Sequence, residues 1–524
     1  MSEDGVNVPR LAFKHDSSFF RKIATGAVGT RAVLEDLGRR GHEPVELERG
    51  SADTKIWKEV KRKRVRIPDV VCLRCGRRAE SRAKTKPGLS MSHSLEAERA
   101  WDYGMVDDDL VAIPICRVAD EAKWAVGRLE DGTSYWHERN WLRWEAFPYV
   151  NYFTVADLRA TAPTKSSTKG VTEGFETSLA WDAIFSTRSG TVKDVDDGTI
   201  QIATPGKSPY RWRNADGLPV RVEAGQKVTE TQVLASSVPP AHNAELGCPG
   251  DLSASRVEEL LRSRERTQRF TGVKVARLLD QIEHHDAVAA LAYDGEEDFY
   301  VRLEGVAYLL ACAGEPADRL LAPYLESNDE SAQLEAVITL GEIGTPDAVA
   351  LLSRMLHDDA GPFFLRSAAA WALGQVGTDV AVESLVGAFG ALDHDLRQEA
   401  LEGVAQIGQA AARHLVGGLR EGDDVASGCA EVLRRLGARD PTAVTRSVVE
   451  GGRLESSVWP VWLLGQLPRS SVEEILGGLS VSPEVDYALK VLWTFAESWV
   501  AETWEPSPGA VFPPRPAEAE EANA

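Results

Sequence analysis

Cysteine is scarce in this sequence, and long apolar runs are absent. Six cysteines in 524 residues are too few for the disulfide framework of a secreted protein, and only Cys72 and Cys75 lie close together. No segment reaches the roughly 18 consecutive apolar residues of a membrane span, and the first residues lack the basic-then-apolar pattern of a signal peptide. We therefore expect a soluble, cytoplasmic protein with no part in a membrane.

Several catalytic signatures are also missing. The sequence contains no glycine-rich phosphate loop, no dinucleotide-binding fingerprint and no recognisable Ser-His-Asp set. The composition, with 43% hydrophobic and 27% charged residues, is that of an ordinary globular protein. A chain of 524 residues is long enough for about three to four domains.

Positive charge is in short supply, but it is concentrated in one stretch. The chain has 59 Lys and Arg against 80 Asp and Glu, and its net charge of −21 argues against a polyanionic partner. Between Lys55 and Lys86, however, there are thirteen basic and three acidic residues, so this stretch carries +10 and the rest of the chain −31. This clustering predicts contact with nucleic acid, DNA or RNA. The candidate contact residues are Lys55, Lys58, Lys61, Arg62, Lys63, Arg64 and Arg66.

The C-terminal half contains a repeat of about 30 residues. Blocks that begin with an apolar residue and end in Gly four residues later start at Leu310, Leu340, Leu373, Val404 and Leu433. Small and apolar residues at helical spacing precede each block, which predicts a helix that Gly ends in a left-handed cap. Two helices per unit cannot bury their apolar faces alone, so the units must stack.

This pattern resembles the HEAT repeats, in their short phycobilisome-lyase-type form, over residues 296–482. Helices within 254–285 and 483–504 would close the two ends of the array. The resemblance implies an all-α solenoid whose concave surface recruits a protein partner.

The whole chain is therefore expected to be a multidomain α+β protein. Residues 189–202 predict two strands around an Asp-Gly turn, and with residues 222–235 they resemble a barrel-sandwich hybrid, a small all-β module with a structural role. The expected domains are an α/β domain (1–165), the β module (166–245), the HEAT solenoid (246–505) and a disordered, acidic, Pro-rich tail (506–524).

The N-terminal domain carries the candidate chemistry. Its expected elements are a helix over 18–41, a strand over 43–48, a β-hairpin of residues 66–73 and 78–84, a helix over 94–104 and a strand at Leu110–Val118. Pro68-Asp69 on the first hairpin strand and Glu80 on the second, in this order of elements, resemble the PD-(D/E)xK restriction-endonuclease-like family over residues 18–120.

The resemblance implies roles for the matching residues. Asp69 and Glu80 would bind Mg²⁺ or Mn²⁺, which activates water for phosphodiester cleavage. The family's Lys is replaced by Arg82, which can bind phosphate but cannot act as a base, and Lys84 lies two residues further along the same face. A third acid would come from Glu35, Glu46 or Glu48. Whether this set of catalytic candidates turns over a substrate is left open.

Cys72-Leu-Arg-Cys75-Gly at the hairpin turn has the spacing of a zinc knuckle. The two missing ligands would be His93 and Cys116, the nearest candidates along the chain. The alternative is a pair of reduced, half-buried thiols without a metal.

Three hypotheses follow. The first is a nuclease-like protein that acts on DNA or RNA with a divalent metal, while the solenoid recruits a protein partner. The second is a non-catalytic HEAT scaffold whose basic N-terminal domain (the head), stabilised by a structural zinc ion, docks on nucleic acid. The third is an adaptor in a salt-adapted cell, in which the basic stretch binds an acidic protein.

Overall fold

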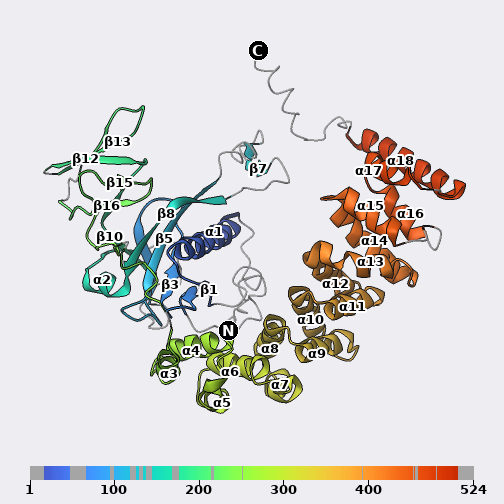
Figure 1. The fold of residues 1–524 in the computed structure, drawn as a ribbon, viewed down its shortest axis with the longest axis horizontal. Helices are drawn as coiled ribbons and strands as arrows, with labels where there is room; N and C mark the ends of the chain where they lie inside the picture. Colours follow the sequence, from blue (N-terminus) through green and yellow to red (C-terminus); the bar gives the residue numbers. More distant parts are fainter. Residues whose placement is uncertain are drawn as a thin grey trace, which may run out of the picture. The chain divides into compact units, whose positions relative to one another are not determined.

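A computed structural model of the chain provides the elements drawn in Figure 1. By its internal contacts the chain divides into two compact units, Met1–Ala313 and Gly314–Ala524. The residues that the structure describes are 17–47, 67–94, 100–118, 126–128, 134–136, 144–167, 176–196, 198–213, 217–242, 244–250, 252–391, 393–451, 454, 458–479 and 481–504.

A five-stranded mixed sheet lies at the centre of the N-terminal domain. Its strands follow the order β1-β2-β3-β5-β8, with β3 and β5 parallel and the other neighbours antiparallel. The elements are α1 (Ser17–Arg39), β1 (Pro44–Glu46), β2 (Val70–Cys72), β3 (Arg78–Ser81), β5 (Leu110–Val118) and β8 (Trp144–Thr154). The first helix, the first strand, the hairpin and the strand Leu110–Val118 are therefore confirmed.

One expected helix does not form in the described part of residues 94–104. Residues 100–104 make turns that end at Gly104, where φ is +76°. Residues 89–94 form a strand, β4 (Leu89–Ser94), which pairs with β10 (Glu176–Trp181). The alternation of buried Leu89 and Met91 with more exposed serines has the period of a strand, and this alternation decides the local structure.

Both faces of the central sheet are buried. One face packs against α1, and the other against β4 and Trp101. Because side chains alternate along a strand, β5 feeds both cores: Leu110 and Ala112 enter the α1 side, while Val111, Ile113 and Ile115 enter the β4 side.

Small antiparallel sheets follow the central one. The strands β12 (Gly190–Asp196) and β13 (Thr199–Ala203) pair on either side of Gly198, which confirms the hairpin expected over 189–202. The barrel-sandwich hybrid and the boundaries of the four domains stay predictions. The remaining elements here are β6 (Val126–Arg128), β7 (Ser134–Trp136), α2 (Val155–Ala160), β9 (Thr164–Ser167), β11 (Ala183–Phe185), β14 (Tyr210–Arg213), β15 (Lys227–Val228) and β16 (Val233–Ser236).

Helices make up the rest of the described chain. The first unit ends with α3 (Ala254–Leu261), α4 (Arg266–Leu278), α5 (His285–Tyr293) and α6 (Phe299–Ala311). The second unit contains α7 (Ala317–Leu325), α8 (Glu330–Ile343), α9 (Pro346–His357), α10 (Phe363–Val376), α11 (Asp379–Gly387), α12 (His394–Ile407), α13 (Ala412–Gly418), α14 (Asp423–Gly437), α15 (Pro441–Glu450), α16 (Val458–Gly465), α17 (Arg469–Leu476) and α18 (Pro483–Trp504). None of the helices in the described ranges is long and apolar enough to cross a membrane.

The second unit is a solenoid of two helical rows (Figure 1). The even-numbered helices from α8 to α18 pack on one another in sequence, and so do the odd-numbered helices from α9 to α17. The predicted left-handed glycine caps are confirmed at Gly344 and Gly377, where φ is +63° and +64°. The expectation is wrong at Gly437. This residue is the last of α14, and the residue that caps the helix, Ala438, keeps a right-handed helical conformation.

Close approach of the even-numbered helices yields a first prediction. A Cβ atom added at Gly374 would lie 2.8 Å from the Cα atom of Gly403, so α10 and α12 would have to separate. We expect Gly374→Ala to destabilise the solenoid by about 1–3 kcal/mol, the usual cost of overpacking. Urea unfolding followed by circular dichroism measures this change.

The matched control is Gly417→Ala. No atom lies within 4 Å of a Cβ atom placed at this position in α13. This substitution should leave the solenoid unchanged or stabilise it by up to about 1 kcal/mol through helix propensity. Equal effects of the two substitutions would contradict the close packing of α10 on α12.

Candidate metal centre

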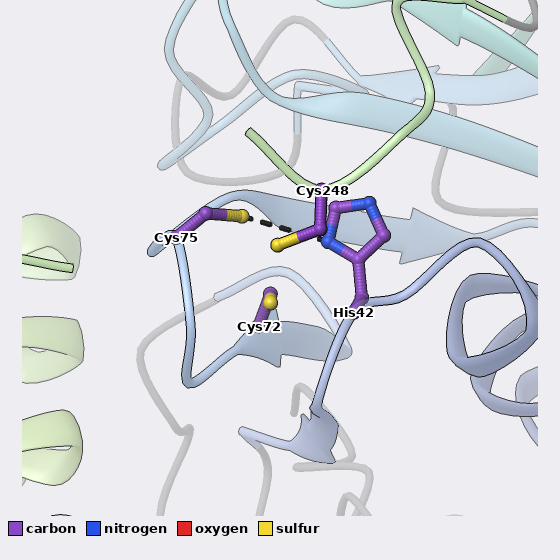
Figure 2. Close-up of side chains that lie close together, drawn as sticks. All are labelled: His42, Cys72, Cys75 and Cys248. Carbon is purple, nitrogen blue, oxygen red and sulfur yellow. Dashed lines mark hydrogen bonds between the residues drawn. The ribbon is translucent and has the colours of Figure 1, made fainter. Parts of the chain in front are cut away.

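Three separate segments bring four metal-binding side chains together in the N-terminal domain. His42 follows the end of α1, Cys72 ends β2, Cys75 lies in the hairpin turn, and Cys248 lies between β16 and α3. One donor atom from each of the four residues lies within 4.8 Å of the others. Figure 2 shows their side chains converging on a common point.

Local backbone structure positions these residues. Gly41, with φ of +86°, turns the chain after α1, and the backbone N–H of His42 donates to the carbonyl of Leu37 at 3.1 Å. Gly76, with φ of +72°, closes the hairpin turn and donates to the carbonyl of Cys72 at 2.8 Å. Glycine suits both turns because it adopts positive φ without a steric penalty.

The imidazole of His42 is oriented for metal binding. Its Nε2 lies 3.0 Å from the carbonyl oxygen of Leu246, and its Nδ1 lies 3.5 Å from Sγ of Cys75. Since a carbonyl oxygen only accepts hydrogen bonds, Nε2 carries the proton and Nδ1 directs its lone pair toward the sulfurs. Metal-ligating histidines are usually fixed in this way by a second hydrogen bond.

The thiols interact strongly with one another. The hydrogen bond with Cys75 lowers the pKa of Cys72 to about 3, against the opposing effect of burial. The same hydrogen bond raises the pKa of Cys75 well above its usual range. One thiolate is therefore already favoured in this cluster, and thiolate is the form of cysteine that binds metal ions.

The donor set fits a structural zinc ion. Three cysteines and one histidine are a common ligand set of tetrahedral Zn²⁺ sites. Four protein ligands leave no open position for water or substrate, which distinguishes a structural zinc site from a catalytic one. In the part of the chain that the structure describes, this cluster is the sole group of three or more His, Cys, Asp or Glu side chains close enough to hold a metal ion.

Of the four predicted zinc ligands, the structure brings together Cys72 and Cys75 only. His93 lies on β4, where it pairs with Thr177 of β10, and Cys116 lies buried in β5, where its thiol faces the carbonyl of Thr25 at 3.8 Å. Burial raises the pKa of Cys116 to about 11, so its thiol stays protonated.

Sequence reasoning missed the other two members of the cluster because they are remote along the chain. His42 precedes Cys72 by 30 residues, and Cys248 follows Cys75 by 173. The available local signals were weak: a Gly-His pair at a helix end and a Cys-Pro-Gly turn.

The nuclease candidates on the β2–β3 hairpin are arranged differently. Because Val70 pairs with Ala79, Asp69 lies opposite Glu80 and on the same face of the sheet. Beyond β3 the backbone N–H groups of Arg82 and Lys84 donate to β5 carbonyls at 2.8 and 3.0 Å, so the chain stays extended. By strand alternation all four nuclease candidates share the face that β4 and Trp101 cover.

Each of these side chains already has a protein contact. The carboxylate of Asp69 accepts a hydrogen bond from the N–H of Ser81 at 2.7 Å, and Glu80 forms an ion pair with Arg82 at 2.9 Å. Lys84 lies 3.4 Å from the hydroxyl of Ser90, and burial lowers its pKa.

The candidate third acids are not part of this arrangement among the described residues. Glu35 is an exposed residue of α1 that pairs with Arg31, and Glu46 is exposed on the edge strand β1. Glu48 and the basic residues Lys55, Lys58, Lys61, Arg62, Lys63, Arg64 and Arg66 lie outside the described residues.

Comparisons with known proteins bear on the helical region. The model of the HEAT repeats matches residues 286–373 and 317–405. A solved structure of an engineered protein is 22% identical, covers 45% of this chain and 96% of its own length, and has a TM-score of 0.20. Human deoxyhypusine hydroxylase in complex with glycerol is 17% identical over 43% of this chain and 85% of its own, with a TM-score of 0.17. No curated protein matches the chain. The helical part of this chain therefore contains HEAT repeats, as its 30-residue period predicted.

Proposed function

We propose that this protein is a non-catalytic HEAT scaffold whose N-terminal head is held together by a structural zinc ion and docks on nucleic acid. The observation that carries the proposal is the convergence of His42, Cys72, Cys75 and Cys248. HEAT repeats are helical scaffolds that commonly mediate protein interactions, which supports a protein partner on the solenoid.

Zinc at this cluster would connect elements that are distant along the chain. It would tie the end of α1 and the turn of the β2–β3 hairpin to the segment that leads into α3. Hydrogen bonds already connect the same segments. The N–H of Cys248 donates to the carbonyl of Arg40 at 3.3 Å, and the side chain of Arg77 donates to the carbonyl of Glu245 at 2.5 Å.

Nucleic-acid docking is supported by the distribution of charge. The β2–β3 hairpin, which carries Cys72 and Cys75, lies within residues 55–86. This stretch has a net charge of +10, whereas the whole chain has a net charge of −21. Two basic residues of the hairpin turn, Arg74 and Arg77, form hydrogen bonds on or near the surface. Phosphate contacts by such a cluster release counterions, so binding should weaken steeply as salt is added.

The salt dependence of binding tests this docking. We expect the combined substitution of Lys61, Arg62, Lys63 and Arg64 by Ala to reduce the slope of log K against log salt by up to about 3.6 on duplex DNA, or about 0.9 per lost phosphate contact. Fluorescence anisotropy with labelled single- and double-stranded DNA and RNA measures the slope.

Replacing Lys193, Lys207, Lys227 and Lys490 by Ala is the control, because it removes the same charge from the exposed surface elsewhere. Retention of the full slope in the first variant would refute docking through this stretch. Absence of binding to any nucleic acid at moderate salt would favour an acidic protein partner instead.

A metal-dependent nuclease is the second candidate. It is favoured by the face that Asp69, Glu80 and Lys84 share, on a hairpin preceded by a helix and a strand. The ion pair between Glu80 and Arg82 opposes it, because the guanidinium takes the place of a divalent cation on that carboxylate. We therefore expect no cleavage of mixed DNA and RNA substrates with Mg²⁺ or Mn²⁺. Cleavage that Asp69→Ala and Glu80→Ala both abolish would establish the nuclease in place of the non-catalytic head.

A further inference from the structure

The C-terminal end of the solenoid has an apolar groove. It lies between α16 and α18, is open to solvent and has a volume of about 1020 Å³. Its lining includes Val458, Val461, Trp462, Tyr487 and Val491, and among the described lining residues Glu484 is the one that is charged. The last repeat of a solenoid normally presents a polar outer face to water. Here the side chains of Val458 and Tyr487 are 69% and 71% exposed. We therefore expect another polypeptide segment to cover this apolar surface.

We propose that this groove binds the Pro-rich segment Val511–Arg515 of the same chain. The segment reads Val-Phe-Pro-Pro-Arg, with Pro516 after it. Pro-rich segments bind aromatic-lined grooves because their extended conformation is largely preformed and little entropy is lost. Trp462 and Tyr487 supply the aromatic side chains of this groove.

The length of the connection fits this occupant. The helix α18 ends at Trp504, and Phe512 follows eight residues later. If about two of these residues make the reversal, the remaining six span about 19 Å in the polyproline conformation, at about 3.1 Å per residue. About twelve residues of α-helix span a similar distance, about 18 Å at 1.5 Å per residue. A chain that turns back along α18 therefore brings Phe512 level with Leu492, which lines the groove.

Charge favours the same arrangement. Three residues beyond Phe512 is Arg515, the one basic residue of 505–524, and in this direction it approaches Glu484 near the start of α18. The acidic residues Glu518, Glu520 and Glu521 would then extend beyond the groove. The proposal assigns a hydrophobic anchor to Phe512 and an ion pair to Arg515.

Hydrogen exchange of the full chain, read by mass spectrometry, tests the proposal. Phe512→Asp should lower the protection of amides in α16 and α18 at least about tenfold, the factor expected for losing one buried Phe side chain. Val380→Asp is the control, because it changes an apolar side chain that is 58% exposed on another helix, α11. Unchanged protection in the Phe512→Asp protein would overturn the proposal.

A charge exchange tests the direction of the segment. Glu484→Arg and Arg515→Glu should each reduce protection of the groove, and the double variant should restore it. Failure of the double variant to restore protection would overturn the ion pair and the direction assigned here. Protection that rises with protein concentration, together with a dimer in light scattering, would show that the segment of a second copy fills the groove and would overturn binding within one chain.

Discussion

Cys248→Ser should abolish stoichiometric zinc binding and destabilise the N-terminal unit. Cys248 is the member of the cluster that joins the segment before α3 to the sheet, so its loss leaves an incomplete zinc site. Zinc binding contributes about 10–16 kcal/mol of apparent free energy in small zinc domains, and removal of one ligand should forfeit several kcal/mol of it. We expect a matching loss of stability when the unchanged protein is treated with a chelator.

Metal content measured by mass spectrometry and calorimetric unfolding check this result together. Cys312→Ser is the matched control, since this half-buried thiol lies outside the cluster after α6 and donates to the carbonyl of Arg277. It should retain one zinc ion per chain and nearly all of its stability. One zinc ion per chain in the Cys248→Ser protein would exclude Cys248 as a ligand. No zinc in the unchanged protein after refolding with Zn²⁺ would reject the metal centre altogether.

Asp109→Ala should strongly destabilise the N-terminal unit. Asp109 accepts two hydrogen bonds from Arg78, at 2.9 and 2.5 Å, and a third from the N–H of Val106 at 2.8 Å. The side chain of Arg78 is only 1% exposed, so water cannot replace the lost carboxylate. Breaking a buried ion pair by removing one partner costs about 3–5 kcal/mol.

The Arg78–Asp109 pair also connects α4 to the central sheet. Arg78 donates at 3.3 Å to the carbonyl of Thr267 and to the hydroxyl of Thr271, both on α4. We therefore expect Asp109→Ala to increase hydrogen exchange in α3 and α4 as well as to lower the unfolding temperature of the unit.

The double variant Arg78→Met/Asp109→Ala provides the comparison. Removal of both charges leaves no unpaired ion in the core, so the double variant should be less destabilised than the sum of the single variants. Additive losses would contradict the coupling of these two side chains. A loss below about 1 kcal/mol for Asp109→Ala alone would contradict the cost of a buried unpaired charge.

The sequence by itself determined the elements whose signals are local. The solenoid was readable because each HEAT unit repeats its apolar spacing and, at Gly344 and Gly377, its left-handed cap within about 30 residues. The hairpin that carries Cys72 and Cys75 was readable from the alternation of its strands. The helix expected over 94–104 was wrong at residues 100–104, where Asp102 and Gly104 favour turns over a helix and Gly104 adopts a positive φ.

Only the tertiary structure decided which residues complete the metal centre. A ligand set is defined by distances in space, and neither His42 nor Cys248 carries a periodic signal that links it to the cysteine pair. The sheet order places the end of α1 beside the hairpin, and the return of the chain after β16 brings Cys248 to the same point. The same long-range pairing put Arg78 against α4, a contact that depends on register and burial rather than on sequence spacing.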